Sequence, residues 1–385
     1  MVNNRELKKY DSHIVGYYGM HNSGDDALMH ASIWGARHLL HNPQTSVGLY
    51  GVHSELLSVE NQCLLERKQA FPGHNRLIQY QAAIRSDSII FGGGSVFHSE
   101  SDINLKRHML ALSNGRHSRA VGVSLGPFQS AASERACGHF LNKCGFVGVR
   151  DQESFDIAKA IAPQANVEKT FDLAPLLICA QQHSPSHTQR KGIALSLCSV
   201  AIRPNGMTDE KAEQRRILRL CMLIVSLYQR TGEAITLLTL NGHETLGDWK
   251  VNQAIMNRLS GRLPITIKKY QPNPFKVLNE LANYQAIISM RLHGSILGYL
   301  AKTPVISINY HTKCQGWCEQ AGVATQYQFE PSNIDVDAIT HEVEQGISVG
   351  FIEPTLQIST AITRALSNWS IRHEQAKIYS RYSAI

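Results

Sequence analysis

The sequence lacks the features that would point to a membrane-spanning, secreted or nucleic-acid-binding protein. No apolar run is long enough to cross a bilayer, and the first ten residues are polar, without the apolar core of a secretory signal. The basic residues are scattered, with no run rich in Lys and Arg and interleaved with aromatic residues. We therefore expect a cytoplasmic protein that does not bind nucleic acid.

Eight cysteines are present, but the spacing that marks a metal or redox site is missing. None of them forms a Cys-x-x-Cys pair, and most lie within apolar runs, which is typical of reduced, buried thiols. Cys314 and Cys318 could share one face of a helix, but two thiols alone make a weak zinc site. We expect neither a metal nor a cofactor.

The composition is that of a folded protein with more than one domain. The 385 residues are 43% hydrophobic and 18% charged, and a chain of this length is too long for one ordinary core. The net charge of +7 favours anionic partners. A small anionic substrate fits, as does an acceptor displayed on a lipid, which would bring the protein to the inner face of the membrane.

Apolar runs alternate with helical patterns in two series, which predicts an α/β fold with parallel sheets. The expected strands of the first series are Ser12–Tyr17, Ser46–Tyr50, Ser88–Phe91, Ala120–Leu125, Phe146–Val149 and Glu168–Phe171. Those of the second are Gly192–Leu197, Ala234–Thr239, Ile265–Ile267, Ala286–Ser289 and Val305–Ile308, with a long helix at Asp209–Thr231. The polar segment 180–191 reads as a linker.

We therefore predict two Rossmann-like parallel-sheet lobes that face a cleft. The N-terminal lobe is expected at residues 1–182 and the C-terminal lobe at residues 190–350. Residues 351–385 have helical apolar spacing, and by analogy with other two-lobed folds this tail would cross back to the first lobe.

Two glycine-rich segments in the first lobe are candidate ligand contacts. Gly16–Leu28 follows the first strand and opens a helix, where free N–H groups favour an anion or a polar oxygen. A tight turn capped by Asp25 or Asp26 explains it equally well, and the absence of Gly-x-Gly-x-x-Gly argues against a dinucleotide. Gly92-Gly93-Gly94 stands at the expected end of a strand, where it forms either a substrate floor or a turn with positive φ.

Two arginines follow expected strands. Arg150 could clamp a carboxylate or phosphate, or form a structural pair with the adjacent Asp151. Arg203 follows the first strand of the second lobe and would face the cleft, although a solvated loop is the commoner place for arginine.

The most informative segment is Met290-Arg291-Leu292-His293-Gly294, which closes an apolar run and is followed by Lys313 after the next expected strand. In an extended segment the side chains of Arg291 and His293 point to one side. Cationic and titratable groups at the ends of parallel strands indicate an active site that handles an anion.

Taken in order, these segments resemble the polysaccharide pyruvyl transferase family. The resemblance runs through Gly16–Leu28, Gly92–Gly94, Gly122–Pro127, Val149–Ser154, Thr170–Asp172, Met290–Gly294 and Pro304–Lys313. It implies a GT-B-like pair of lobes, with the acceptor on the N-terminal side and the donor on the C-terminal side. It also implies transfer from phosphoenolpyruvate, a substrate, to two hydroxyls of a sugar in an exopolysaccharide or its lipid-linked precursor. The products that the resemblance implies are a cyclic pyruvate ketal and phosphate.

This chemistry suggests a role for each candidate residue. Phosphoenolpyruvate carries a carboxylate and a phosphate, so its site needs at least two cationic clamps. His293 is the expected acid, because an imidazolium can protonate the methylene carbon. Donor binding is assigned to Arg203, Arg291, Lys313 and Gly294, further catalytic roles to Arg291, Lys313 and Arg150, and acceptor binding to Asn22, Asp25, Gly93 and Gly94.

Two other functions remain open. A GT-B nucleotide-sugar glycosyltransferase would also need cations for its diphosphate, and Glu319 could then hold a ribose. A saccharide-binding protein that has lost catalysis would usually have lost a charged member of the set, and Arg203, Arg291, His293 and Lys313 are all present.

Overall fold

The structure is a computed structural model that describes residues 8–51, 54–113, 115, 117–181, 189–200, 209–259 and 261–369. The chain divides into two compact units. The first takes in the described residues of Met1–Met20, Asp25–Gln182 and Ile358–Ile385, and the second those of His21–Gly24 and His183–Gln357. The units differ from the predicted lobes at His21–Gly24 and at residues 351–357, which group with the second unit. Among the residues that the structure describes, none of the helices has both the length and the apolar character of a membrane span.

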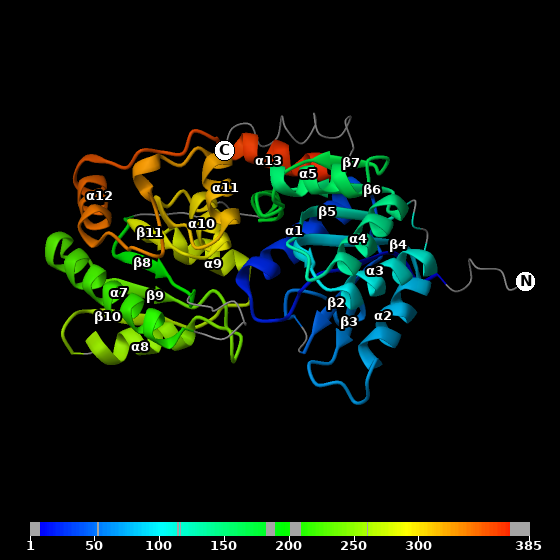
Figure 1. Ribbon diagram of the computed structural model, residues 1–385, viewed down its shortest axis with the longest axis horizontal. Helices are drawn as coiled ribbons and strands as arrows, with labels where there is room; N and C mark the ends of the chain where they lie inside the picture. The colour runs from blue at the N-terminus through cyan, green and yellow to red at the C-terminus, as the bar shows by residue number, and fades with distance from the viewer. Residues whose placement is uncertain are drawn as a thin grey trace, which may run out of the picture. The chain divides into compact units, whose positions relative to one another are not determined.

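The first unit contains a seven-stranded sheet in the order β3-β2-β1-β4-β5-β6-β7, with every pairing parallel (Figure 1). Its strands are β1 Tyr10–Val15, β2 Thr45–Tyr50, β3 Gln62–Leu65, β4 Ser86–Phe97, β5 Arg119–Leu125, β6 Phe146–Val149 and β7 Val167–Lys169. Its helices are α1 Ser23–Leu39, α2 His74–Ile84, α3 Glu100–Leu112, α4 Ala131–Lys143, α5 Gln152–Ile161, α6 Leu176–Ala180 and α13 Ile358–Leu366. The first two residues of α1 group with the second unit.

The second unit contains a six-stranded parallel sheet in the order β10-β9-β8-β11-β12-β13. Its strands are β8 Ile193–Ser196, β9 Ile235–Leu238, β10 Ile265–Lys268, β11 Ala286–Ser289, β12 Val305–Ile308 and β13 Gln328–Phe329. Its helices are α7 Glu210–Thr231, α8 Trp249–Leu259, α9 Pro274–Leu281, α10 Leu292–Leu300, α11 Thr312–Ala321 and α12 Val336–Val349. The predicted α/β fold with two parallel-sheet lobes is confirmed.

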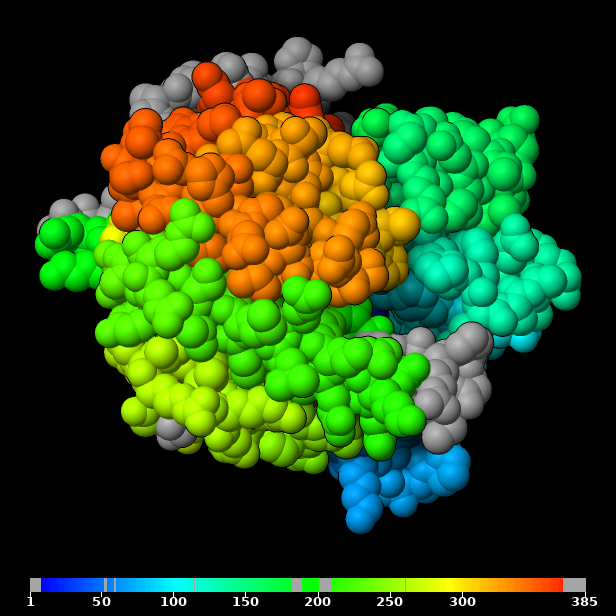
Figure 2. Space-filling view, turned by 60° about the vertical axis from the view of Figure 1, so that its left-hand side comes forward, coloured from blue at the N-terminus to red at the C-terminus, as the bar shows by residue number. Residues whose placement is uncertain are grey.

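Helix α7 shows how the sequence sets an element's limits. It was expected at Asp209–Thr231, and Asp209 caps it by accepting a hydrogen bond from the amide of Ala212 at 3.1 Å. Gly232 ends the helix with a φ of 70°, the left-handed conformation that glycine adopts readily. Helix α12 packs along α7, and an ion pair between Arg230 and Glu344 joins them (Figures 1 and 2, green and orange).

The glycine run of β4 lies inside the strand, so the prediction of a strand end at Gly92–Gly94 is wrong. The strand continues to Phe97, and its register against β5 shifts between Gly94 and Phe97. Gly93 and Gly94 have φ values of 66° and 84°, which side chains rarely tolerate. The irregular backbone therefore requires glycine at these two positions.

The C-terminal segment packs within the first unit. Trp369 is fully buried and lies against Gly35 of α1, where an added Cβ would stand 2.0 Å from the indole. Asn368 is also fully buried. Its carboxamide accepts hydrogen bonds from the amide of Gly122 at 2.6 Å and the hydroxyl of Thr170 at 2.7 Å, and donates to the carbonyl of Phe171 at 2.8 Å.

We expect Asn368→Ala to lower the free energy of unfolding by about 2–4 kcal/mol, because it leaves several buried polar groups without partners. Urea denaturation measures the change. Asn142→Ala is the matched control, because Asn142 is exposed on α4, and its loss should cost no more than about 0.5 kcal/mol. Equal effects of the two substitutions would show that the Asn368 network contributes little.

Candidate functional site

The candidate residues gather where the strand order of the second sheet reverses. From β8 the chain continues to β9 and β10 on one side, and from β11 it continues to β12 and β13 on the other side. The strand order therefore reverses between the neighbours β8 and β11. Open α/β sheets bind ligands outside the carboxyl ends of the strands at such a switch point. Arg291 lies two residues beyond the end of β11, and Cys198 lies two residues beyond the end of β8.

Arg291 is held by a carboxylate that the sequence did not reveal. Its Nε and Nη2 donate to Oδ1 of Asp248 at 2.9 and 2.5 Å. The other oxygen of Asp248 accepts the amides of Leu240 and Asn241 at 3.0 and 2.9 Å. The Asp248 side chain is fully buried, and no described residue accepts a hydrogen bond from Nη1 of Arg291. Asp248 therefore fixes the guanidinium while leaving one nitrogen for a ligand.

The electrostatics of this cluster follow from its burial. Burial alone would lower the pKa of Arg291, but the Asp248 carboxylate outweighs it and raises that pKa above its usual range. Burial raises the pKa of Tyr310 to about 12 and that of Cys198 to about 11. Near pH 7, Arg291 is thus a fixed cation, and its neighbours Tyr310 and Cys198 are neutral.

Helix α10 begins next to Arg291 without a capping side chain. Side chains of Ser99, Asp151, Asp209 and Asn273 cap α3, α5, α7 and α9 in the usual way. Two buried hydroxyls near the start of α10, Ser196 Oγ and Ser295 Oγ, have no hydrogen-bond partner among the described residues. An uncapped helix start with unsatisfied polar groups nearby is suited to an anion.

His293 lies in the first turn of α10, so the prediction of an extended Arg-Leu-His segment is wrong. The strand stops at Ser289, and the helix starts at Leu292. Gly294, predicted to bind the donor, packs closely on the sheet, because a Cβ there would stand 2.3 Å from Ser289 Oγ. A helix that starts this close to its strand still places Arg291 and His293 at the same edge of the sheet.

The imidazole of His293 lies against the backbone of Gly24. A Cβ on Gly24 would stand 2.4 Å from Nδ1 of His293, which only glycine avoids. The amide of Gly24 donates to Oδ1 of Asn22 at 3.0 Å. The amide of Ser23 donates to the carbonyl of Leu240 at 2.9 Å, which ties this turn to the end of β9. Asn22, predicted for the acceptor, therefore lies in the same unit as His293.

Lys313 also reaches the carboxyl edge of the second sheet. It stands in the first turn of α11, which follows β12, the neighbour of β11. His311 caps this helix by accepting the amide of Lys313 at 3.1 Å. The structure thus brings Arg291, His293, Gly294 and Lys313 to one edge. Arg203 lies outside the described residues.

The remaining acceptor candidates meet in the first unit. Its sheet reverses order between β1 and β4, and Gly93 and Gly94 belong to β4 there. A Cβ on Gly94 would stand 3.5 Å from Oδ1 of Asp25, and one on Gly93 would stand 2.9 Å from Leu28 of α1. Asp25, Gly93 and Gly94 therefore share the switch point of the first sheet.

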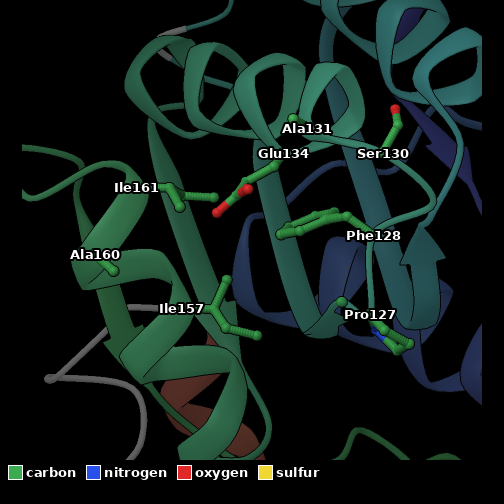
Figure 3. Close-up of a pocket in the computed structure, with 9 residues that line it drawn as sticks. Pro127, Phe128, Ser130, Ala131, Glu134, Ile157, Ala160 and Ile161 are labelled. Carbon is green, nitrogen blue, oxygen red and sulfur yellow. The ribbon is translucent and has the colours of Figure 1, made fainter.

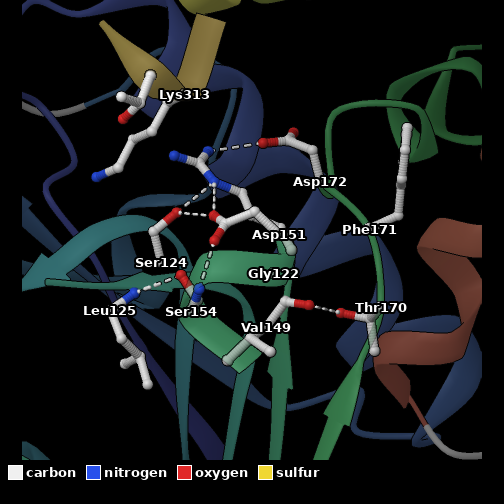
Figure 4. Close-up of polar contacts among 12 residues, drawn as sticks. Gly122, Ser124, Leu125, Val149, Asp151, Ser154, Thr170, Phe171, Asp172 and Lys313 are labelled. Atoms are coloured by element: carbon white, nitrogen blue, oxygen red, sulfur yellow. Dashed lines mark hydrogen bonds and ion pairs between the residues drawn. The ribbon is translucent and has the colours of Figure 1, made fainter. Parts of the chain in front are cut away.

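Arg150 is buried in a polar network of the first unit, and Figure 4 shows the network members Ser124, Asp151 and Asp172. Its Nη1 donates to Asp172 and its Nε to the hydroxyl of Ser124, both at 2.7 Å. Asp151, the partner considered from the sequence, forms a longer ion pair with Nε at 3.9 Å and also caps α5 through the amide of Ser154 at 2.8 Å. The arrangement is typical of a structural ion pair, and it fixes the end of β6.

A shallow cavity of about 430 Å³ in the first unit contains none of the predicted site residues. Phe128, Ile157 and Ile161 line it together with Glu134 (Figure 3). Among the residues that the structure describes, no group of three or more His, Cys, Asp or Glu side chains is placed to hold a metal ion.

Comparison with solved structures confirms the fold class. UDP-GlcNAc 2-epimerase from Methanocaldococcus jannaschii is similar with a TM-score of 0.58 and 9% identity, over 91% of this chain and 97% of that chain. HepE from Anabaena, in complex with UDP and glucose, is similar with a TM-score of 0.56 and 12% identity, over 97% and 98%. At such identities the likeness shows the fold alone, which is the GT-B type.

A family model adds what the fold alone does not give. The model described as polysaccharide pyruvyl transferase matches residues 22–312, about three quarters of the chain. The fold and this match define a transferase with a GT-B-like architecture. The chain belongs to the polysaccharide pyruvyl transferase family.

Proposed function

We propose that the protein transfers a pyruvyl group from phosphoenolpyruvate to two hydroxyls of a saccharide, forming a cyclic ketal and releasing phosphate. The observation that carries the proposal is the match to the family over residues 22–312, a range that includes the first turns of α1 and α10. The cations after β11 and β12 support it, because this donor carries two anionic groups.

In this proposal the donor binds at the carboxyl edge of the second sheet. Nη1 of Arg291 and the ammonium of Lys313 bind its carboxylate and phosphate, and the uncapped start of α10 stabilises the phosphate as it leaves. Arg203 supplies a third cation. These side chains neutralise the charge, and the proposal involves no metal or cofactor.

His293 is the proposed general acid. Its imidazolium protonates the methylene carbon of the donor, which becomes a methyl group, while one sugar hydroxyl forms a C–O bond to the neighbouring carbon. The second hydroxyl then forms the other C–O bond as the bond to phosphate breaks. The two hydroxyls give up two protons, one of which balances the methyl group and the other the hydrogen phosphate, so His293 ends reprotonated.

The acceptor is a saccharide, free or lipid-linked, and a lipid-linked acceptor would bring the protein to the inner face of the membrane. We assign its contacts to Asn22, Asp25, Gly93 and Gly94. The assignment of Asn22 is supported by its position next to the turn that carries Gly24. The assignment of Gly93 and Gly94 is supported by the backbone of β4, which carries no side chains there. Arg150 is assigned an indirect role, because Ser124 and Asp172 already engage its guanidinium.

Gly24→Ala should lower kcat about a hundredfold, because a displacement of about 1 Å in a catalytic group can cost that much. The new methyl group would overlap the imidazole of His293. Phosphate release under saturating substrates measures the effect. Gly316→Ala on α11 is the matched control, because a Cβ there meets no atom within 4 Å, and its activity should not change. A Gly24→Ala enzyme with normal kcat would show that the ring position is not important.

The reaction itself is tested by phosphate release from phosphoenolpyruvate with and without galactosides, glucosides and mannosides, followed by mass spectrometry. A sugar-dependent signal with the mass of a pyruvate ketal supports the proposal. The GT-B relatives named above act on or bind UDP compounds, so UDP-sugars belong in the same panel. Glycosyl transfer from a UDP-sugar, with no release from phosphoenolpyruvate, would replace pyruvyl transfer with the glycosyltransferase function.

A further inference from the structure

A basic cavity of about 290 Å³ lies in the second unit beside the candidate site, at the carboxyl ends of β9 and β10. Three lysines line it: Lys268 ends β10, Lys269 follows it, and Lys276 stands in the first turn of α9. Ser23, from the turn that packs on His293, lines it as well. The cavity is thus a cationic space next to the proposed acid.

The charge of this cavity is not balanced by its own residues. Its one carboxylate, Glu280, already accepts a hydrogen bond from the hydroxyl of Tyr284 at 2.5 Å and pairs with Lys268 at 3.3 Å. The ammonium groups of Lys269 and Lys276 form no hydrogen bond or ion pair with any residue that the structure describes. Two ammonium groups are therefore available to an anion.

A buried hydroxyl at the cavity is also without a partner. Ser23 is completely buried, and its Oγ forms no hydrogen bond within the described part of the chain. A buried hydroxyl without a partner costs stability, and a bound ion or water that completes its hydrogen bond is one explanation for such a group. The Ser23 amide is already used by the carbonyl of Leu240, so the backbone of this cavity-lining residue is held in place.

We propose that this cavity binds a phosphate group. Oxyanions are the natural ligands of ammonium groups and a hydroxyl donor, and the volume exceeds that of a single phosphate, which leaves room for a diphosphate or an attached sugar. Ser23 is adjacent in sequence to Gly24, whose backbone lies against His293, so the cavity adjoins the turn that packs on the proposed acid. The phosphate group is either carried by the acceptor or released from the donor. These two sources rest on the proposed function, whereas the proposal that the cavity binds phosphate does not.

Calorimetric titration of the full chain with inorganic pyrophosphate tests the binding independently of turnover. The wild type should bind at two sites, one here and one at the start of α10. The double variant Lys269→Ala/Lys276→Ala should bind pyrophosphate about tenfold or more weakly at the cavity. Binding at the start of α10 should not change. Lys250→Ala is the control, because Lys250 is exposed on α8 and does not line the cavity. Unchanged binding by the double variant, or equal weakening in the control, would overturn the proposal, whether or not the protein forms ketals.

Ser23→Ala separates a ligand contact from a structural role. It should lower pyrophosphate affinity about tenfold without lowering the thermal midpoint, because the native hydroxyl has no partner to lose. A lower midpoint with unchanged affinity would contradict the assignment. Competition of glucose 1-phosphate and inorganic phosphate against pyrophosphate then identifies the source. Stronger competition by the sugar phosphate indicates an acceptor-borne group, and equal or weaker competition indicates free phosphate.

Discussion

His293→Ala is expected to lose ketal formation about a thousandfold, because general acid catalysis by a positioned side chain contributes roughly 10²–10⁴. Binding of phosphoenolpyruvate should be largely retained, because the anionic groups of the donor are assigned to Arg291, Lys313 and the start of α10. Phosphate release measures kcat, and calorimetry in the absence of a sugar measures donor affinity.

His341→Ala provides the control for this experiment. His341 is exposed on α12 in the same unit, so its loss should change neither quantity. A His293→Ala enzyme that loses donor affinity as strongly as turnover would show that the imidazole binds the donor. The role of acid would then have to move to another group at this edge of the sheet.

The features that local sequence controls were predicted well. The buried strands of both sheets were found because parallel strands covered on both faces are nearly continuous apolar runs; β6, β11 and β12 have the predicted bounds. The two missed strands, β3 and β13, are partly exposed edge strands of four and two residues, which is too short to stand out as apolar runs. Arg291 and Lys313 could be placed at one edge because the carboxyl ends of neighbouring parallel strands must meet there.

The parts of the site that depend on tertiary packing could not be predicted. Asp248 is separated from Arg291 by 43 residues, and in the sequence it looks like an ordinary acidic residue before a helix. The same limit applies to Gly24. A side chain is excluded at this position because His293 packs on its backbone, and the sequence does not reveal that contact. Arg150 forms its shorter ion pair with Asp172, at 2.7 Å, while the adjacent Asp151 lies 3.9 Å away and caps α5.

The largest effect on stability is expected from Asp248→Ala. Removing one partner of a buried ion pair typically costs about 3–5 kcal/mol, because the remaining charge stays buried without compensation. Here the loss also leaves the amides of Leu240 and Asn241 without their acceptor. Urea denaturation should therefore show a free energy of unfolding lower by about this amount, and donor affinity should fall because Arg291 is no longer held in place.

Glu344→Ala is the matched control, because it breaks another Arg–carboxylate pair of the same unit. In that pair the side chain of Arg230 is 39% exposed and that of Glu344 is 32% exposed. Exposed pairs contribute about 0–1 kcal/mol, so this variant should remain close to the wild type. Asp248→Leu/Arg291→Met should recover part of the stability lost in Asp248→Ala, because it removes the unpaired charge. It should not recover donor binding, since it lacks the guanidinium. Recovered stability without recovered binding would separate the cost of burying this pair from its use at the site. Equal losses of stability in Asp248→Ala and Glu344→Ala would show that Asp248 does not hold Arg291.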